Sequence, residues 1–153
     1  MKLRKVISGG QTGADKTGLI EAKKLGLETG GTAPKGYRTD EGADFSLRDD
    51  YGLQESYTYD YAPRTRTNVN DGDVTVWFGK TNSPGYYCTK NACRQYGKEL
   101  YENPSPLQLE YLANTFEVWN VAGNRKRKNT LVVGLVEEAF KVVADLLQRS
   151  ESQ

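Results

Sequence analysis

The sequence predicts an α/β protein with a mostly parallel β-sheet that is covered by helices on both faces. Its 153 residues are enough for one ordinary domain. Short apolar segments alternate with longer segments of helical periodicity, which is typical of right-handed βαβ units. Polar, glycine-rich loops follow several apolar segments, at the sheet edge where such folds bind ligands. We therefore expect residues 1–153 to form a single ligand-binding domain with a flexible tail at residues 149–153.

The first half of the chain supplies three of the expected strands and two of the helices. The first helix is indicated by an apolar face that includes Leu19 and Leu25, and Gly26 stands at its stop position. The strand after it is weak because glycines interrupt it. The second helix is short and runs into a turn. The strands are expected at residues 4–8, 27–33 and 53–58, and the helices at residues 12–26 and 64–73.

The second half alternates strands and helices more regularly. The segment DVTVWFG is β-branched and aromatic, which favours a buried strand. Pro106 suits the first turn of a helix, and Val132, Val136 and Phe140 belong to one apolar stripe of the last and clearest helix. The strands are expected at residues 73–79, 98–102 and 116–123, and the helices at residues 89–98, 106–115 and 129–150.

Composition and charge argue against several classes of partner. The formal net charge is +1, so no overall field attracts nucleic acid or a membrane surface. No stretch approaches the roughly 20 apolar residues that span a bilayer. The first ten residues are basic but contain no apolar segment of the kind found in signal peptides. We therefore expect a cytoplasmic protein that binds neither nucleic acid nor membranes.

The cysteine and histidine content limits the chemistry that a site can perform. The chain has two cysteines, Cys88 and Cys93, and no histidine, whereas a structural zinc site needs about four such ligands. We therefore expect two ordinary thiols and no metal site. The usual general base near neutral pH is also missing. No catalytic residue is assigned, and the sequence favours a binding protein over an enzyme.

The segment SGGQTGAD, residues 8–15, follows the first strand and opens the first helix. The start of a helix has free N–H groups and a partial positive charge, which together suit a phosphate. Glycines here allow an oxygen to approach the backbone closely, while Asp15 can bond either a ribose-like hydroxyl or N–H groups of the loop itself. The alternative is a tight turn with no ligand. The candidate ligand-binding residues of this loop are Gly9, Gly10, Gln11, Thr12, Gly13 and Asp15.

This segment resembles the opening of the putative molybdenum cofactor carrier proteins, in the wider group related to the lysine-decarboxylase-like (LOG) proteins. Further motifs that resemble this family follow in order: APKG at residues 33–36, YAPRTRTNVNDGDVT at residues 61–75 and NVAGNR at residues 120–125. NSPGYYCT at residues 82–89 is a looser match. Together the motifs cover most of the chain.

The resemblance implies a single Rossmann-like domain that self-associates as a dimer or tetramer. It implies that the ligand is the molybdenum cofactor, a phosphorylated pterin whose dithiolene holds molybdenum, carried without a reaction. The alternative is a nucleotide-binding enzyme of the LOG-like type, which would be a nucleoside monophosphate N-glycosidase or a phosphohydrolase. Such enzymes carry a PGGxGT element, which this sequence lacks.

The other motifs supply the rest of the expected ligand site. Each candidate has a structural alternative: Lys35 can be a solvated turn residue, Arg64 can pair with Asp60, and Thr89 can cap a helix. In the run RKRK, only Arg125 is expected to contact the ligand. The candidates are Lys35, Gly36, Arg64, Thr67, Asn68, Ser83, Gly85, Thr89, Asn120, Gly123 and Arg125.

Overall fold

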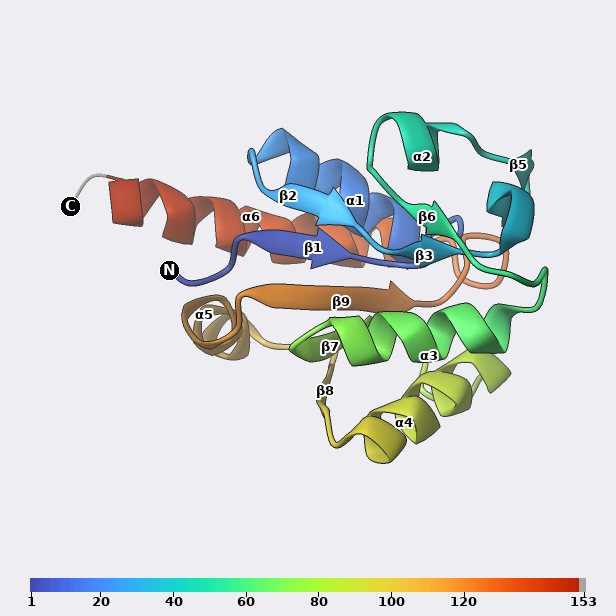
Figure 1. Cartoon of the computed structure of the whole chain (residues 1–153). Coiled ribbons are helices and arrows are strands. Elements are labelled where there is room, and N and C mark those ends of the chain that lie inside the picture. Colours follow the sequence, from blue (N-terminus) through green and yellow to red (C-terminus); the bar gives the residue numbers. More distant parts are fainter. Residues whose placement is uncertain (152–153) are drawn as a thin grey trace.

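The computed structural model describes residues 1–151, which form a Rossmann-like α/β domain (Figure 1). Five parallel strands form the main sheet in the order β2-β1-β9-β7-β8, so the α/β fold expected from the sequence is confirmed. The sheet strands are β1 (Lys5–Ile7), β2 (Glu28–Gly30), β7 (Val74–Phe78), β8 (Glu99–Glu102) and β9 (Val118–Gly123).

Helices cover both faces of the sheet (Figure 1). One face packs against α1 (Ala14–Lys24), α5 (Pro106–Thr115) and α6 (Val132–Glu151), and the other against α3 (Tyr61–Asp71) and α4 (Pro84–Tyr96). The larger core lies on the first face, where Trp119 packs against Phe140. Burial of such side chains is the main favourable contribution to folding.

The strand register brings the loops that follow three strands to one edge of the sheet. Ile7 of β1 lies level with Asn120 of β9, and Phe78 of β7 lies level with Gly123 at the end of β9. The chain therefore leaves β1, β7 and β9 on the same side. In parallel sheets this carboxyl edge is where ligands bind.

Residues 32–58 form an additional layer of short elements that the sequence reasoning largely missed. They pack on α1 through a small apolar cluster that includes Leu19, Leu47 and Leu53. The elements are β3 (Thr32–Ala33), the 3₁₀ turn η1 (Lys35–Tyr37), β4 (Arg38–Thr39), β5 (Gly42–Ala43), α2 (Ser46–Asp49) and β6 (Gln54–Glu55). β3 pairs with β6, and β4 pairs with β5 in a hairpin.

Three expected elements differ from the structure. The strand expected at residues 27–33 is split at Gly31, whose φ of 122° is incompatible with a continuous strand. Of the strand expected at residues 53–58, only Gln54 and Glu55 pair. The helix expected from Thr89 begins instead at Pro84, because Ser83 caps it: its Oγ accepts a hydrogen bond from Tyr86 N at 3.1 Å.

The flexible tail expected at residues 149–153 overlaps the end of a helix. Helix α6 continues through Glu151, because no glycine or proline follows Gly134 to end it. Residues 152 and 153 lie outside the described part of the chain. Among residues 1–151, no helix is long and apolar enough to cross a membrane.

Candidate functional site

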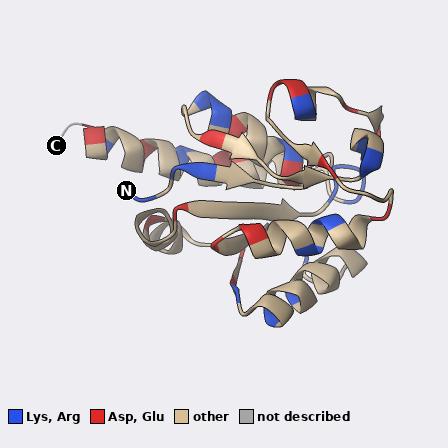
Figure 2. Cartoon of the chain, viewed as in Figure 1, with Lys and Arg blue, Asp and Glu red and all other residues tan. Residues whose placement is uncertain are grey.

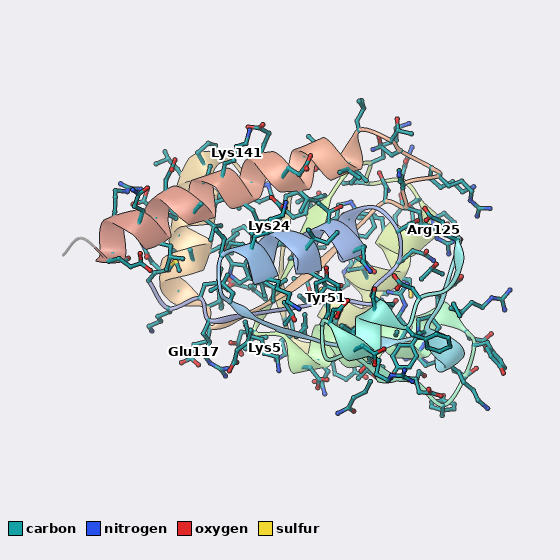
Figure 3. All side chains as sticks on the ribbon, turned by 90° about the horizontal axis from the view of Figure 1, so that it is seen from above. Lys5, Lys24, Tyr51, Glu117, Arg125 and Lys141 are labelled. Atoms are coloured by element: carbon teal, nitrogen blue, oxygen red, sulfur yellow. The ribbon has the colours of Figure 1, made fainter. Side chains whose placement is uncertain are left out.

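A cavity of about 500 Å³ lies at the carboxyl edge of the sheet. Its walls come from the loop after β1, the start of α3, the loop after β7 with the start of α4, and the loop after β9. Figure 3 shows Arg125 at this end of the molecule and Glu117, which precedes β9, at the opposite end. Figure 2 shows the basic loop after β9 at the same edge.

Eight of the candidate residues expected from the sequence line this cavity. They are Gln11, Asp15, Arg64, Ser83, Gly85, Thr89, Gly123 and Arg125. A small recess of about 20 Å³ shares Asp15, Arg64 and Thr89 with the cavity, and three further candidates, Gly9, Asn68 and Asn120, line it. The structure thus brings these residues together from four separate sequence motifs.

The glycines of the first loop allow other parts of the protein to pack closely against the loop backbone. A Cβ on Gly9 would overlap the Arg64 guanidinium, and one on Gly10 would lie 2.6 Å from Leu47 Cδ1. A Cβ on Gly13 would lie 2.5 Å from the carbonyl oxygen of Asn124. These glycines therefore position the loop against its neighbours, and neither Gly10 nor Gly13 lines the cavity.

The N–H groups of this loop are largely used within the loop. Gly10 N donates to Ser8 Oγ at 3.2 Å, and Gln11 N donates to Asp15 Oδ2 at 3.4 Å. Thr12 N donates to Oε1 of Gln11 at 3.0 Å. Of the two alternatives for Asp15, the structure has the bond to the loop's own N–H group. Three of the loop's peptide nitrogens are therefore already engaged, and a ligand at this wall meets the side chains of Gln11 and Asp15.

The Gln11 side chain presents an unpaired donor. Its Oε1 accepts hydrogen bonds from the N–H groups of Thr12 and Asp40, at 3.0 and 2.9 Å, so this atom must be the oxygen. The amide nitrogen Nε2 therefore takes the other position. It is buried and has no hydrogen-bond partner within residues 1–151, although the whole residue is only 4% exposed. Buried donors in folded proteins are normally paired, so an ordered water or a ligand can serve as the acceptor here.

Arg64 presents a second unpaired donor beside it. Its Nη1 lies 3.3 Å from Asp15 Oδ2, and the two side chains are 13% and 6% exposed. Arg64 therefore pairs with Asp15 and not with Asp60, the alternative considered from the sequence. The Arg64 Nε group is also buried without a partner among the described residues. Two orphan N–H donors thus belong to residues that line one cavity.

Burial makes Asp15 an unusual carboxyl group. Burial raises the pKa of Asp15 above its ordinary value of 3.8, and the Arg64 charge and the Gln11 N–H group offset this only in part. The folded protein therefore binds this proton more tightly than the unfolded chain. It follows that the contribution of Asp15 to stability is greatest below its ordinary pKa and is lost as the pH rises through the folded pKa.

We expect the stability of Asp15→Asn relative to wild type to rise with pH above about pH 4, the ordinary pKa of this carboxyl group. The variant has no buried carboxyl to ionise, so it lacks the pH-dependent cost. The measurement is urea unfolding of both proteins across this range. Asp44→Asn is the control: despite desolvation, hydrogen bonds from Lys16 and Ser46 hold the pKa of Asp44 below 3.8, so its pH dependence lies below about pH 4 and its stability difference should be flat above that pH. A flat difference for Asp15→Asn would contradict the assignment.

The loop after β9 supplies more cations than the sequence reasoning assigned to it. Arg125 lines the cavity as expected, and Arg127 and Lys128 line it too. Lys80, in the loop after β7, was also missed. The signal was present, because the RKRK run directly follows a buried strand and Lys80 lies two residues beyond β7.

The start of α4 faces the same cavity. Ser83, Gly85 and Thr89 line it, and a Cβ added to Gly85 would have no atom nearer than Ser83 Oγ at 4.0 Å. The backbone is therefore open here, in contrast to the first loop. The N-terminus of α4, which carries a partial positive charge, therefore forms part of the cavity wall. Cys88 also lines the cavity, and both cysteines are free thiols.

Several candidates lie away from the cavity wall. The Lys35 ammonium group sits 5.5 Å from the centroid of the Tyr59 ring, and Thr67 Oγ1 donates to the carbonyl of Pro63 in its own helix. Asn68 fastens β3 to α3 through two hydrogen bonds with the backbone of Thr32. Neither the cavity nor the recess is lined by Lys35, Gly36, Thr67, Gly10, Thr12 or Gly13.

The chain was compared with known proteins. The model of the circularly permuted YpsA SLOG family matches residues 6–144. A similar solved structure is a "Putative molybdenum carrier protein" from Syntrophus aciditrophicus SB, which is 31% identical and has a TM-score of 0.80. The match covers 92% of this chain and 94% of that one. No curated protein matches significantly. This chain belongs to the circularly permuted YpsA SLOG family.

Proposed function

We propose that this protein binds and carries a phosphorylated small molecule, the molybdenum cofactor. The observation that carries the proposal is the pair of buried, unpartnered donors, Gln11 Nε2 and Arg64 Nε, on residues that line one cavity. Leaving a buried donor unsatisfied costs about 1–3 kcal/mol. Both nitrogens have almost no accessible surface, so a ligand that offers acceptor oxygens reaches them only by displacing neighbouring side chains, and it then recovers that cost.

The rest of the cavity suits a phosphate. Arg125, Lys80 and Lys128 line it, and the start of α4 adds open backbone at Gly85. Phosphate oxygens accept hydrogen bonds from such groups, and a helix start favours negative charge. A pterin carries ring carbonyl and nitrogen acceptors as well as its phosphate. The donor set therefore fits a phosphorylated pterin, with the pterin acceptors facing Gln11 and Arg64.

The solved relative supports a ligand that contains molybdenum. The relative's name describes a molybdenum carrier, and it matches this chain over most of both lengths. In this proposal the bound cofactor supplies the molybdenum through its dithiolene. The residues of this chain bind and orient the pterin and its phosphate. Self-association, which the family resemblance implies, is part of the same proposal.

The test is binding of a phosphorylated pterin to wild type and to Lys80→Ala/Lys128→Ala. Neither lysine has a carboxylate partner in residues 1–151, so the double variant should fold normally. We expect its affinity to fall by about a hundredfold, because two charge-assisted contacts are lost. Native mass spectrometry gives the bound mass and the number of subunits together, and calorimetry gives the affinity.

Lys126→Ala is the matched control for this experiment. Lys126 is exposed and lies in the same loop as Lys128, but it does not line the cavity. This variant should bind as tightly as wild type. Equal affinity of all three proteins, or no binding to wild type at all, would contradict the proposal.

A second candidate function is hydrolysis of a nucleoside monophosphate, favoured by Asp15. This carboxyl lines the cavity, and burial raises its pKa. A raised pKa favours the protonated form, which is the form that a general acid needs. Incubation with nucleoside monophosphates, followed by detection of free base or inorganic phosphate, separates the two functions. A carrier releases neither product. Release that disappears in Asp15→Asn would support the enzyme instead.

A further inference from the structure

Asp40 connects the β4–β5 hairpin to the cationic side of the cavity. Its Oδ1 lies 3.1 Å from Arg125 Nη1, and its Oδ2 lies 3.6 Å from Arg127 Nε. Its backbone N–H group also donates to Oε1 of Gln11, which fixes the hairpin against the first loop. The carboxylate is 12% exposed, and Oδ2 accepts no hydrogen bond from any described residue. Arg127 is therefore held by charge and not by a hydrogen bond.

The charges around the cavity divide into two groups. Five cationic side chains line it: Arg64, Lys80, Arg125, Arg127 and Lys128. The three arginines are each paired with a carboxylate, Arg64 with Asp15 and the other two with Asp40. Within residues 1–151 the two lysines have no carboxylate partner. Because Arg125 and Arg127 share one carboxylate, the five cations exceed Asp15 and Asp40 by three positive charges, and the two lysines carry two of them.

We propose that Asp40 is a positioning residue that limits the anionic charge the cavity accepts. A phosphate monoester carries about −1.5 to −2 charges at pH 7, which the two lysines can balance. A triphosphate brings more negative charge than the three excess positive charges balance. Asp40 thereby removes one positive charge that a highly charged anion would need. This inference rests on the proposed phosphate-binding function and adds a residue that sets its selectivity.

Asp40 acts through Arg125 and Arg127, since it does not itself line the cavity. A carboxylate 3.1 Å from a guanidinium cancels much of the field that the guanidinium would exert on a ligand. Removing the carboxylate charge frees both arginines at once. The effect must therefore be larger for more highly charged ligands, which separates it from a general loss of structure.

The experiment compares the affinities of inorganic phosphate, pyrophosphate and tripolyphosphate at fixed ionic strength, measured by calorimetry. In Asp40→Asn, we expect the affinity for tripolyphosphate relative to phosphate to rise at least about tenfold over wild type. Glu41→Gln removes the same charge from the next residue of the hairpin, where the exposed side chain has no ion pair among the described residues. It should keep the wild-type ratio, and the conservative variant Asp40→Glu should keep it too.

Two further results complete the test. Adding Arg127→Gln to Asp40→Asn should return the ratio toward wild type, because the released cation is gone. An unchanged ratio in Asp40→Asn, or an equal loss of affinity for all three anions, would overturn the role of Asp40 while leaving phosphate binding intact. If wild type bound none of the anions, the proposed function would fail, and this inference with it.

Discussion

Replacing Gly13 with alanine is expected to lower the free energy of unfolding by about 4 kcal/mol, the combined cost of left-handed strain and overpacking. Gly13 has a φ of 97°, which an L side chain rarely adopts. The new Cβ would also lie 2.5 Å from the backbone oxygen of Asn124 and from the backbone nitrogen of Lys126. Backbone atoms cannot move aside as a flexible side chain can. Urea unfolding measures the loss.

Gly26→Ala is the control that separates the two causes. Gly26 also has a positive φ, 77°, but a Cβ there would meet no atom within 4 Å in the described chain. We expect it to cost only about 1 kcal/mol, from strain alone. Equal losses for the two variants would show that the close approach of the first loop to the loop after β9 has no energetic weight.

Replacing Arg64 with alanine is expected to weaken ligand binding about a hundredfold and to destabilise the fold by about 3 kcal/mol. The binding loss follows from the missing Nε donor. The stability loss follows because the buried Asp15 would lose the charge that offsets part of its desolvation. Calorimetry measures the first effect, and urea unfolding at neutral pH measures the second.

The double variant Asp15→Asn/Arg64→Met separates these two roles of Arg64. It removes both charges, so much of the lost stability should return. The cavity donor is still missing, so binding should stay weak. Recovery of binding together with stability would mean that Arg64 acts only as a structural partner of Asp15.

The sequence predicted the main sheet because its strands and helices are periodic. The strand at residues 73–79 is β-branched and aromatic, and the last helix has a continuous apolar stripe. The layer at residues 32–58 lacks such signals, because its strands are only two residues long. Its order depends on contacts with α1, such as the packing of Leu47 and Leu53 around Leu19, which no local pattern encodes.

The position of the site followed from the topology, but its chemistry did not. Loops after strands were expected to converge, and Gln11, Arg64 and Arg125 do converge. The orphan donor of Gln11 could not be predicted, since its orientation depends on Asp40, which is 29 residues away in the chain. Likewise the first-loop glycines suggested a ligand, whereas their neighbours are other parts of the chain.

The central claim is that the two unpaired donors receive acceptor oxygens from a phosphorylated ligand. The most direct measurement is a crystal structure of the wild-type protein with the phosphorylated pterin. The account predicts a ligand oxygen or ring nitrogen within about 3.2 Å of both Gln11 Nε2 and Arg64 Nε, with the phosphate against Lys80 and Lys128. A ligand bound elsewhere, while both donors are satisfied by water or by side chains of the protein, would contradict it.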